Sequence, residues 1–313
     1  MTHFLSTRRD FLEISSLALA GLALPRHRPQ AIYRFGIVTD PHYADTDMRD
    51  GRFYRESAAK MRECVELMNA EGVDFLIELG DFKDQDEPGV EDDTLRYLGE
   101  IEAEMQRFNG PTYHVLGNHD ADSISKPQFL AAVTNTGIDP ERSWYSFDRG
   151  ALHFVVLDAD FRADGAPYDH GDFDYRDTNL PPEQLDWLAR DLEENRGPTI
   201  LFVHQRLDGE GPLFVNNADE VRMLLRRRGN VVAAFQGHDH AGAYNLIDGI
   251  HYYTLRAMVE GSGPENSSYA IVDVGDAGIG ITGYRRAVSE RLPQPPRATA
   301  STARNDENAG ESP

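Results

Sequence analysis

The chain has 313 residues, of which 40% are hydrophobic and 27% are charged, a composition typical of a globular protein with one large or two small domains. Its formal net charge is −22, and so acidic a surface repels nucleic-acid backbones and anionic lipid, so we expect no nucleic acid polymer as a partner. The single cysteine, Cys64, excludes an internal disulfide bond.

The first thirty residues have the pattern of an export signal. Arg8 and Arg9 precede a short apolar run over residues 14–24 that is rich in Ala and Leu. Paired arginines before such a run are typical of a twin-arginine signal, and the run is too short to span a bilayer. We therefore predict that residues 1–30 engage the twin-arginine export machinery and that the protein is periplasmic, extracellular or at the cell surface, with no stable membrane span after export. An ordinary amphipathic leader or a retained anchor is the alternative.

Residues 31–288 are predicted to form one α/β domain. Its first part alternates between strands and helices, with strands over 33–39, 74–79 and 112–116 and helices over 55–70 and 92–108. Apolar residues recur at helical spacing in both predicted helices. The alternating order predicts parallel strands joined by right-handed crossovers.

The second part of the chain follows a different pattern. Strands are predicted over 144–147, 152–157, 199–203, 231–235, 250–255, 269–274 and 279–284, and a helix begins at Pro181-Pro182. The first two strands and the last two should form hairpins. Residues 160–180 lack periodicity and are predicted to be a long functional loop, and residues 289–313 are predicted to be a disordered tail.

Polar residues that can bind metals follow five of the predicted strands. They are Asp40 and His42, Asp81, Asn118, His204, and His238 with His240. The carboxyl ends of strands in an open α/β sheet converge on one crevice, and carboxylate, amide and imidazole groups suit Mn, Fe or Zn. Two such cations could hold a phosphate, activate water and attract an anion to an acidic protein.

Each of these motifs has an ordinary structural explanation when taken alone. Asp40 could cap a turn, Asp81 could cap the next helix, and His204 could be a buried structural histidine. The ordered set is harder to explain in this way, so we expect a centre with two divalent metal ions.

The motifs Asp40-x-His42, Gly80-Asp81, Gly117-Asn118-His119-Asp120, His204 and Gly237-His238-Asp239-His240 resemble, in order, those of the calcineurin-like metallophosphoesterase family. The resemblance spans most of residues 31–260. It implies a four-layer α/β/β/α sandwich of two mixed sheets flanked by helices. One departure is Asp81-Phe82-Lys83-Asp84, where many relatives have Arg or Asp-Arg after the second motif.

The resemblance also implies a role for each residue of the site. One metal would be held by Asp40, His42 and His240, the other by Asn118, His204 and His238, with Asp81 bridging the two. His119 would face the substrate as a general acid or transition-state stabiliser, and Asp120 would orient or charge His119. Such a site hydrolyses its substrate with a hydroxide bridged between the metals.

A narrower likeness involves the manganese-dependent ADP-ribose/CDP-alcohol diphosphatases. It rests on residues 35–40, Tyr43-Ala44-Asp45, Arg52-x-Tyr54-Arg55, Leu185-x-Trp187-Leu188 and Gly237-His238-Asp239-His240-x-Gly242. It implies an enzyme that cleaves a phosphodiester or phosphoanhydride, such as that of a nucleoside diphosphate conjugate. The predicted signal over residues 1–30 would make this enzyme an exported one.

Four residues are candidates for binding that small-molecule substrate: Tyr43, Arg52, Tyr54 and Tyr175. Tyr175 could stack on a nucleobase or pack the 160–180 loop onto the domain, and the others could belong to the scaffold. The alternative functions are a phosphomonoesterase for phosphate scavenging and a non-catalytic, metal-stabilised binding protein.

Overall fold

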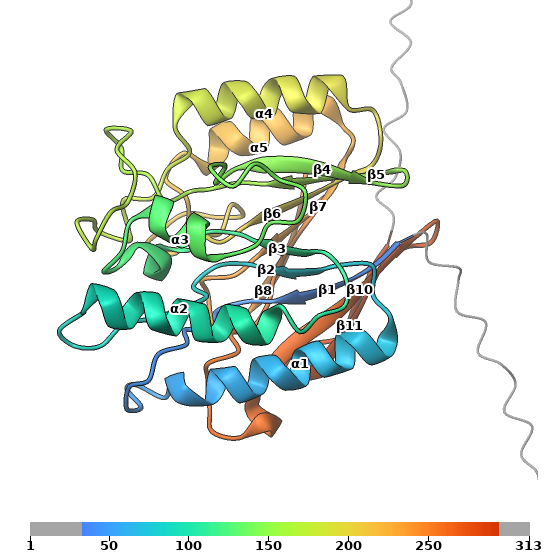
Figure 1. Ribbon diagram of the computed structural model, residues 1–313. Helices are drawn as coiled ribbons and strands as arrows, with labels where there is room; N and C mark the ends of the chain where they lie inside the picture. Colours follow the sequence, from blue (N-terminus) through green and yellow to red (C-terminus); the bar gives the residue numbers. More distant parts are fainter. Residues whose placement is uncertain (1–32, 294–313) are drawn as a thin grey trace, which may run out of the picture.

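A computed structural model describes residues 33–293, so the predicted signal over residues 1–30 lies outside the described part of the chain. Two six-stranded sheets lie face to face (Figure 1). Helices α1 (Ser57–Glu71) and α2 (Glu91–Met105) cover the outer face of one sheet, and α4 (Pro182–Glu194) and α5 (Ala218–Arg228) cover the other. The predicted four-layer sandwich of two mixed sheets is confirmed.

The first sheet has the strand order β12-β11-β10-β1-β2-β3. Its strands are β1 (Tyr33–Val38), β2 (Leu76–Glu78), β3 (Thr112–His114), β10 (Ser268–Gly275), β11 (Gly278–Arg285) and β12 (Glu290–Pro293). As predicted, β1, β2 and β3 are parallel, with α1 and α2 as their connections. Helix α1 ends at Gly72, whose φ of 62° is the left-handed conformation that glycine adopts without strain.

The second sheet has the order β4-β5-β6-β7-β9-β8. Its strands are β4 (Tyr145–Arg149), β5 (Leu152–Val156), β6 (Thr199–Val203), β7 (Val231–Gln236), β8 (Ala243–Ile247) and β9 (Ile250–Thr254). The central strands β5, β6, β7 and β9 are parallel, and β4 and β8 are antiparallel edge strands. Both predicted hairpins, β4–β5 and β10–β11, are present.

Several elements depart from the sequence-based expectation. The tail was expected to begin at residue 289, but Glu290–Pro293 form β12, where Leu292 is buried opposite Ile279 of β11. Backbone pairing and one buried side chain are enough to stabilise a short edge strand, so the sequence of β12 shows no apolar periodicity from which it could be predicted. The short helix α3 (Lys126–Ala132), α5 and β8 were also not predicted.

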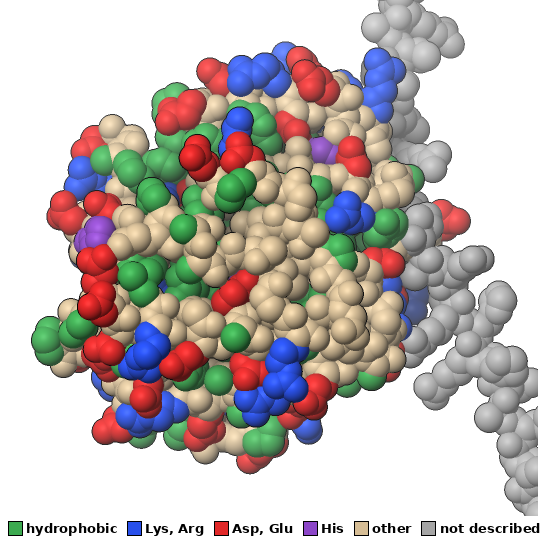
Figure 2. Space-filling model, viewed as in Figure 1, with side chains coloured by type: hydrophobic (Ala, Val, Ile, Leu, Met, Phe, Trp, Pro, Cys, Tyr) green, Lys and Arg blue, Asp and Glu red, His purple; other side chains and the backbone are tan. Residues whose placement is uncertain are grey.

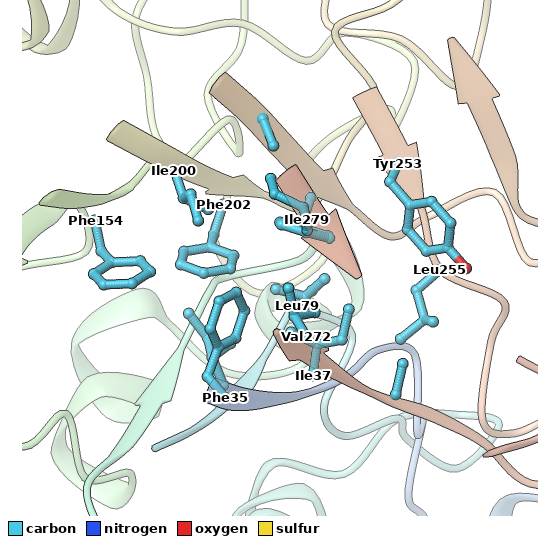
Figure 3. Close-up of a cluster of buried hydrophobic side chains, with 14 of the residues drawn as sticks. Phe35, Ile37, Leu79, Phe154, Ile200, Phe202, Tyr253, Leu255, Val272 and Ile279 are labelled. Atoms are coloured by element: carbon cyan, nitrogen blue, oxygen red, sulfur yellow. The ribbon is translucent and has the colours of Figure 1, made fainter. Parts of the chain in front are cut away.

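An apolar core between the two sheets fixes their relative position. Phe35 on β1 is fully buried and meets the rings of Phe154, Phe202 and Phe235 edge-on, at centroid distances of 5.7, 5.8 and 6.0 Å (Figure 3). Each such side chain contributes about 1.5–3 kcal/mol when buried. Because the sheets are locked together, the strand ends that carry the polar motifs are held in a fixed relation.

The surface is consistent with the acidic composition. Figure 2 shows Asp and Glu side chains interspersed with Lys and Arg over the face in view. Among residues 33–293, the helices are too short or too polar to cross a membrane.

Candidate metal centre

Three of the predicted ligands form a compact cluster at the ends of β1 and β7. The His240 Nε2 atom lies 3.4 Å from Asp40 Oδ1 and 3.2 Å from His42 Nε2, and His42 Nε2 lies 3.7 Å from the same Asp40 oxygen. Asp40 and His42 are fully buried, while His240 is partly exposed. Asp40, His42 and His240, which we call the first half of the centre, could therefore share one metal ion.

A second cluster lies at the ends of β2, β6 and β7. The His204 Nε2 atom is 3.1 Å from Asp81 Oδ2 and 3.2 Å from His238 Nδ1. The same Asp81 oxygen is 3.4 Å from His42 Nε2, so Asp81 connects this cluster to the first half. Asn118, in a short 3-10 turn over Asn118–Ala121, is the remaining predicted ligand; we call Asn118, His204 and His238 the second half.

Unpartnered atoms show that the residues fit divalent metals. Asp40 Oδ1, Asn118 Oδ1 and His238 Nε2 are buried and have no hydrogen-bond partner among the described residues. Buried polar atoms without a partner are rare in native proteins, and each of these offers a lone pair. Two carboxylates, one amide and four imidazoles form a donor set suited to two Mn, Fe or Zn ions.

The backbone at the centre is strained. Asp40, His42, Asp81 and His238 have φ values of 50°, 46°, 57° and 65°, in the left-handed region that non-glycine residues seldom adopt. Such strain persists only where the surrounding structure imposes it, and it is concentrated at functional sites. At Gly237 a Cβ atom would collide with Thr39 Oγ1 and crowd Asp40 Oδ2, so glycine is required beside these ligands.

The protonation of the cluster depends on burial and on neighbouring charges. Burial opposes ionisation of Asp40, but the neighbouring imidazoles of His240 and His42 hold its pKa well below the ordinary value. Burial and the neighbouring His204 lower the pKa of His238 to about 3. Asp40 is therefore charged and His238 neutral near neutral pH, which are the forms that bind metals.

Further groups fix the orientation of the imidazoles. In the first half, His42 Nδ1 lies 3.0 Å from Asp84 Oδ2 and His240 Nδ1 lies 2.7 Å from Glu260 Oε1. In the second half, His204 Nδ1 donates to the backbone oxygen of Leu79 at 2.8 Å. In each pair the nitrogen away from its neighbour is left for a metal.

The structure corrects the predicted partner of His119. The Asp120 carboxylate accepts backbone N–H groups instead, from Asp81 at 3.0 Å, Phe82 at 2.9 Å and Gly117 at 2.9 Å, and so shapes the loop that presents Asp81. The ring of His119 interacts with Asp122, whose Oδ2 lies 2.7 Å from Nδ1. The prediction that Asp120 orients His119 is therefore wrong.

Charges around His119 favour its protonated form. Burial alone would lower its pKa, but the carboxylates of Asp122, Asp84 and Asp81 raise it to about 10. Asp84 Oδ2 is 3.6 Å from His119 Nδ1, farther than the Asp122 oxygen, and Asp84 is also engaged by His42. The sequence offered one signal for Asp122, its i,i+3 spacing from His119, and none for Glu260.

The four candidate substrate residues differ in their positions. Tyr43 donates its hydroxyl to Glu100 Oε2 on α2 at 2.6 Å, and Tyr54 is buried with the Arg49 guanidinium 5.1 Å from the centre of its ring. Both are held in the scaffold rather than presented to a ligand.

Arg52 and Tyr175 lie beside the centre. Arg52 forms a backbone bridge with Glu260, and within residues 33–293 no hydrogen bond or ion pair engages its guanidinium. Tyr175 is 43% exposed, and its ring centroid lies 6.0 Å from that of His238. Of the other aromatic residues of the loop, Tyr168 and Phe173 stack on each other at 4.0 Å and Phe161 packs against Trp144, so none of them covers Tyr175.

Comparisons with known proteins agree with this geometry. A family model described as calcineurin-like phosphoesterase matches residues 33–242. The chain is 30% identical over 291 residues to a protein of Oryza sativa subsp. japonica named manganese-dependent ADP-ribose/CDP-alcohol diphosphatase, covering 78% of this chain and 89% of that one. A protein of the same name from Arabidopsis thaliana is 27% identical, with 83% and 96% covered.

Solved structures show the same fold. A dimetal phosphatase from Danio rerio superposes with a TM-score of 0.73 at 23% identity, covering 84% of this chain and 99% of that one. A purple acid phosphatase from yellow lupin superposes with a TM-score of 0.57 at 14% identity, covering 83% and 52%. The resemblance inferred from the motifs is confirmed.

Proposed function

Because the chain belongs to the calcineurin-like phosphoesterase family and is a metal-dependent phosphoric ester hydrolase with two divalent ions, we propose that it cleaves the phosphoanhydride of nucleoside diphosphate conjugates. The observation that supports this most strongly is the similarity, over most of both chains, to two diphosphatases of that substrate class. ADP-ribose and the CDP-alcohols each consist of a nucleoside, two linked phosphates and a second hydroxyl compound, which differs from one conjugate to another.

We assign the metal ligands from the geometry. Asp40, His42 and His240 would hold one ion, the three residues of the second half would hold the other, and Asp81, which contacts both halves, would lie between them. When bound, the two ions supply charge for the phosphate oxygens and activate the attacking water.

His119 would provide the proton for the leaving group. Asp122 engages Nδ1, so Nε2 is the nitrogen that remains for the substrate. A protonated imidazole can give its proton to the leaving phosphate oxygen, and the surrounding carboxylates favour that form. His119 is 28% exposed at its side chain, which leaves it accessible to a ligand.

Arg52 and Tyr175 would recognise the rest of the substrate. Guanidinium groups bind phosphate oxygens in a bidentate manner, and among residues 33–293 no carboxylate forms an ion pair or hydrogen bond with the Arg52 guanidinium. An exposed aromatic ring such as Tyr175 can stack on a nucleobase. A monoester lacks the second phosphate, and a simple alkyl or aryl monoester also lacks the base, so these contacts favour a diphosphate conjugate over the phosphomonoesterase alternative.

A substrate panel with added manganese tests the proposal. ADP-ribose, CDP-choline, a bis-nitrophenyl diester and a nitrophenyl monoester would be compared by kcat/KM, and the two conjugates should be preferred. Arg52→Met should raise KM for ADP-ribose but not for the monoester, while Arg49→Met, which removes an arginine paired with Glu87, is the matched control. A preference for the monoester would overturn the proposal.

We also propose that residues 1–30 direct export, since Arg8 and Arg9 precede a short apolar run. Replacing both arginines by lysine should retain the full-length protein in the cytoplasm of a host with a twin-arginine pathway. Unchanged export of the double variant would contradict the proposal.

A further inference from the structure

A buried lysine closes a ring of backbone carbonyls next to the metal centre. Lys60 of α1 is 1% exposed, and its Nζ atom donates to the oxygens of four consecutive residues: Met258 at 2.9 Å, Val259 at 3.3 Å, Glu260 at 3.4 Å and Gly261 at 2.7 Å. An ammonium group has only three protons, so at least one proton is shared between two of the four acceptors. The arrangement resembles the coordination of a metal cation by carbonyl oxygens. Burying this charge is costly unless such contacts compensate, and the carbonyl oxygens would repel one another without it.

The residues 258–261, which we call the carbonyl segment, hold the first half of the metal centre. The N–H groups of Met258 and Val259 donate to the backbone oxygens of Thr39 and Asp40, at 3.0 and 3.1 Å. The Glu260 carboxylate lies 2.7 Å from His240 Nδ1. The carbonyl segment thus touches the backbone of one ligand and the ring of another.

The second half has different supports. Leu79 accepts the hydrogen bond of His204, and His238 Nδ1 contacts His204 itself. The backbone N–H of His238 also donates to Asp40 Oδ2 at 3.2 Å, which is the one contact of these three that reaches the first half, and none of the three involves the carbonyl segment directly. A change in the carbonyl segment should therefore affect the metal of the first half much more than that of the second.

We propose that Lys60 is a built-in monovalent cation and a positioning residue for the first half of the centre. The Lys60 ammonium group holds the four carbonyl oxygens together and so fixes the conformation of the carbonyl segment. This conformation places the Glu260 carboxylate against His240 Nδ1, and that contact orients the imidazole for its metal ion. The proposal rests on the metal assignment made under Proposed function. Two further contacts, from Phe53 N to Val259 O and from Arg286 Nη1 to Glu260 O, should keep the carbonyl segment folded when Lys60 is replaced.

The test measures manganese binding to each half separately by electron paramagnetic resonance. His238→Ala leaves the first half intact and His240→Ala leaves the second. Lys60→Met should raise the dissociation constant for manganese about tenfold or more when it is added to His238→Ala, which reports on the first half. It should raise that constant less than about twofold when it is added to His240→Ala, which reports on the second half. This difference is in line with the usual effect of groups that orient metal ligands. Lys126→Met, which removes another buried lysine, one paired with Asp158, is the control and should spare the first half.

Two further measurements separate positioning from general damage. Lys60→Ala should recover part of its manganese affinity when ammonium ions are added, whereas Lys126→Ala should not. Should Lys60→Met unfold, Lys60→Arg gives the same comparison, because it keeps the charge but cannot direct it at four converging oxygens. Equal loss in both halves, or no loss in the first half, would overturn the role of Lys60. A wild-type protein that binds fewer than two manganese ions would instead overturn the metal assignment.

Discussion

The two halves of the metal centre are built from similar ligands but supported differently. In the first half, carboxylates contact the Nδ1 atoms of two imidazoles: Asp84 contacts His42, and Glu260 contacts His240. In the second, His204 is supported by a neutral backbone carbonyl, and the proposed oxygen ligand is the unpartnered amide of Asn118. A carboxylate makes an imidazole a stronger donor and adds negative charge near the ion. The first half should therefore bind its metal more tightly, and the second should lose its metal first.

Asp81 contacts residues of both halves and is proposed as the ligand that they share, so its removal should have the largest effect. Asp81→Ala should abolish binding of both metals and reduce turnover by about three orders of magnitude or more, because several kcal/mol of transition-state stabilisation come from the ions. Elemental analysis after dialysis measures the outcome. Retention of two metals by the variant would show that the halves do not share this carboxylate.

The ring centroid of His119 lies 4.7 Å from that of His42 in the first half, and His119 follows Asn118 of the second half in the chain, but we assign it to neither. His119→Ala should leave two metals bound and lower kcat by roughly 10²–10⁴, the range for loss of a general acid. The measurement pairs metal content with turnover on the same sample. Loss of metal from this variant would make His119 a ligand and would remove the distinction between ligands and proton donor.

The sequence predicted those parts of the centre that lie at strand ends. Asp40, Asp81 and His204 each follow a buried strand. Parallel order places the strand ends at one edge of each sheet, and the packing of the two sheets brings these edges together. The alternation of strands and helices predicted an α/β domain with parallel strands, and the resemblance of the motifs to a known family implied the four-layer arrangement.

The supporting residues could not be found in this way. Glu260 lies 20 residues from His240 along the chain, and Lys60 lies 198 residues from Met258 of the carbonyl segment. Nothing in a local pattern marks such contacts. The sequence also could not show whether Asp120 or Asp122 contacts the His119 ring. That depends on the directions of the two carboxylates, one inside the 3-10 turn Asn118–Ala121 and the other at the residue that follows it.

Glu260→Gln would sharpen the difference between the halves. The amide keeps the shape of the side chain but loses its charge, so manganese affinity in the first half should fall by about 10- to 100-fold while the second half is unchanged. The measurement is a manganese titration with resolved dissociation constants. Glu265→Gln, at an exposed position on the same loop, is the control. An equal effect on both constants would remove the basis for the comparison.

Asp122→Asn should have the smallest effect and no effect on either half. The asparagine oxygen can still accept a hydrogen bond from the Nδ1–H group of His119, so the ring stays in place, but the negative charge that helps to raise the pKa of His119 is lost. A group with a raised pKa keeps its proton until the pH rises through that value. The pKa is about 10 without metals, and bound cations lower it in both proteins alike.

The alkaline limb of the kcat profile should therefore move to lower pH in Asp122→Asn, with a loss of about tenfold on that limb and less at acid pH. Asp120→Asn should behave differently. Its carboxylate accepts the backbone N–H of Asp81, so weakening that contact should lower metal content without moving the limb. If Asp120→Asn moved the limb and Asp122→Asn did not, Asp120 would after all be the residue that charges His119. The pair of variants thus separates a carboxylate that acts on the proton donor from one that acts on the ligand shared by the two halves.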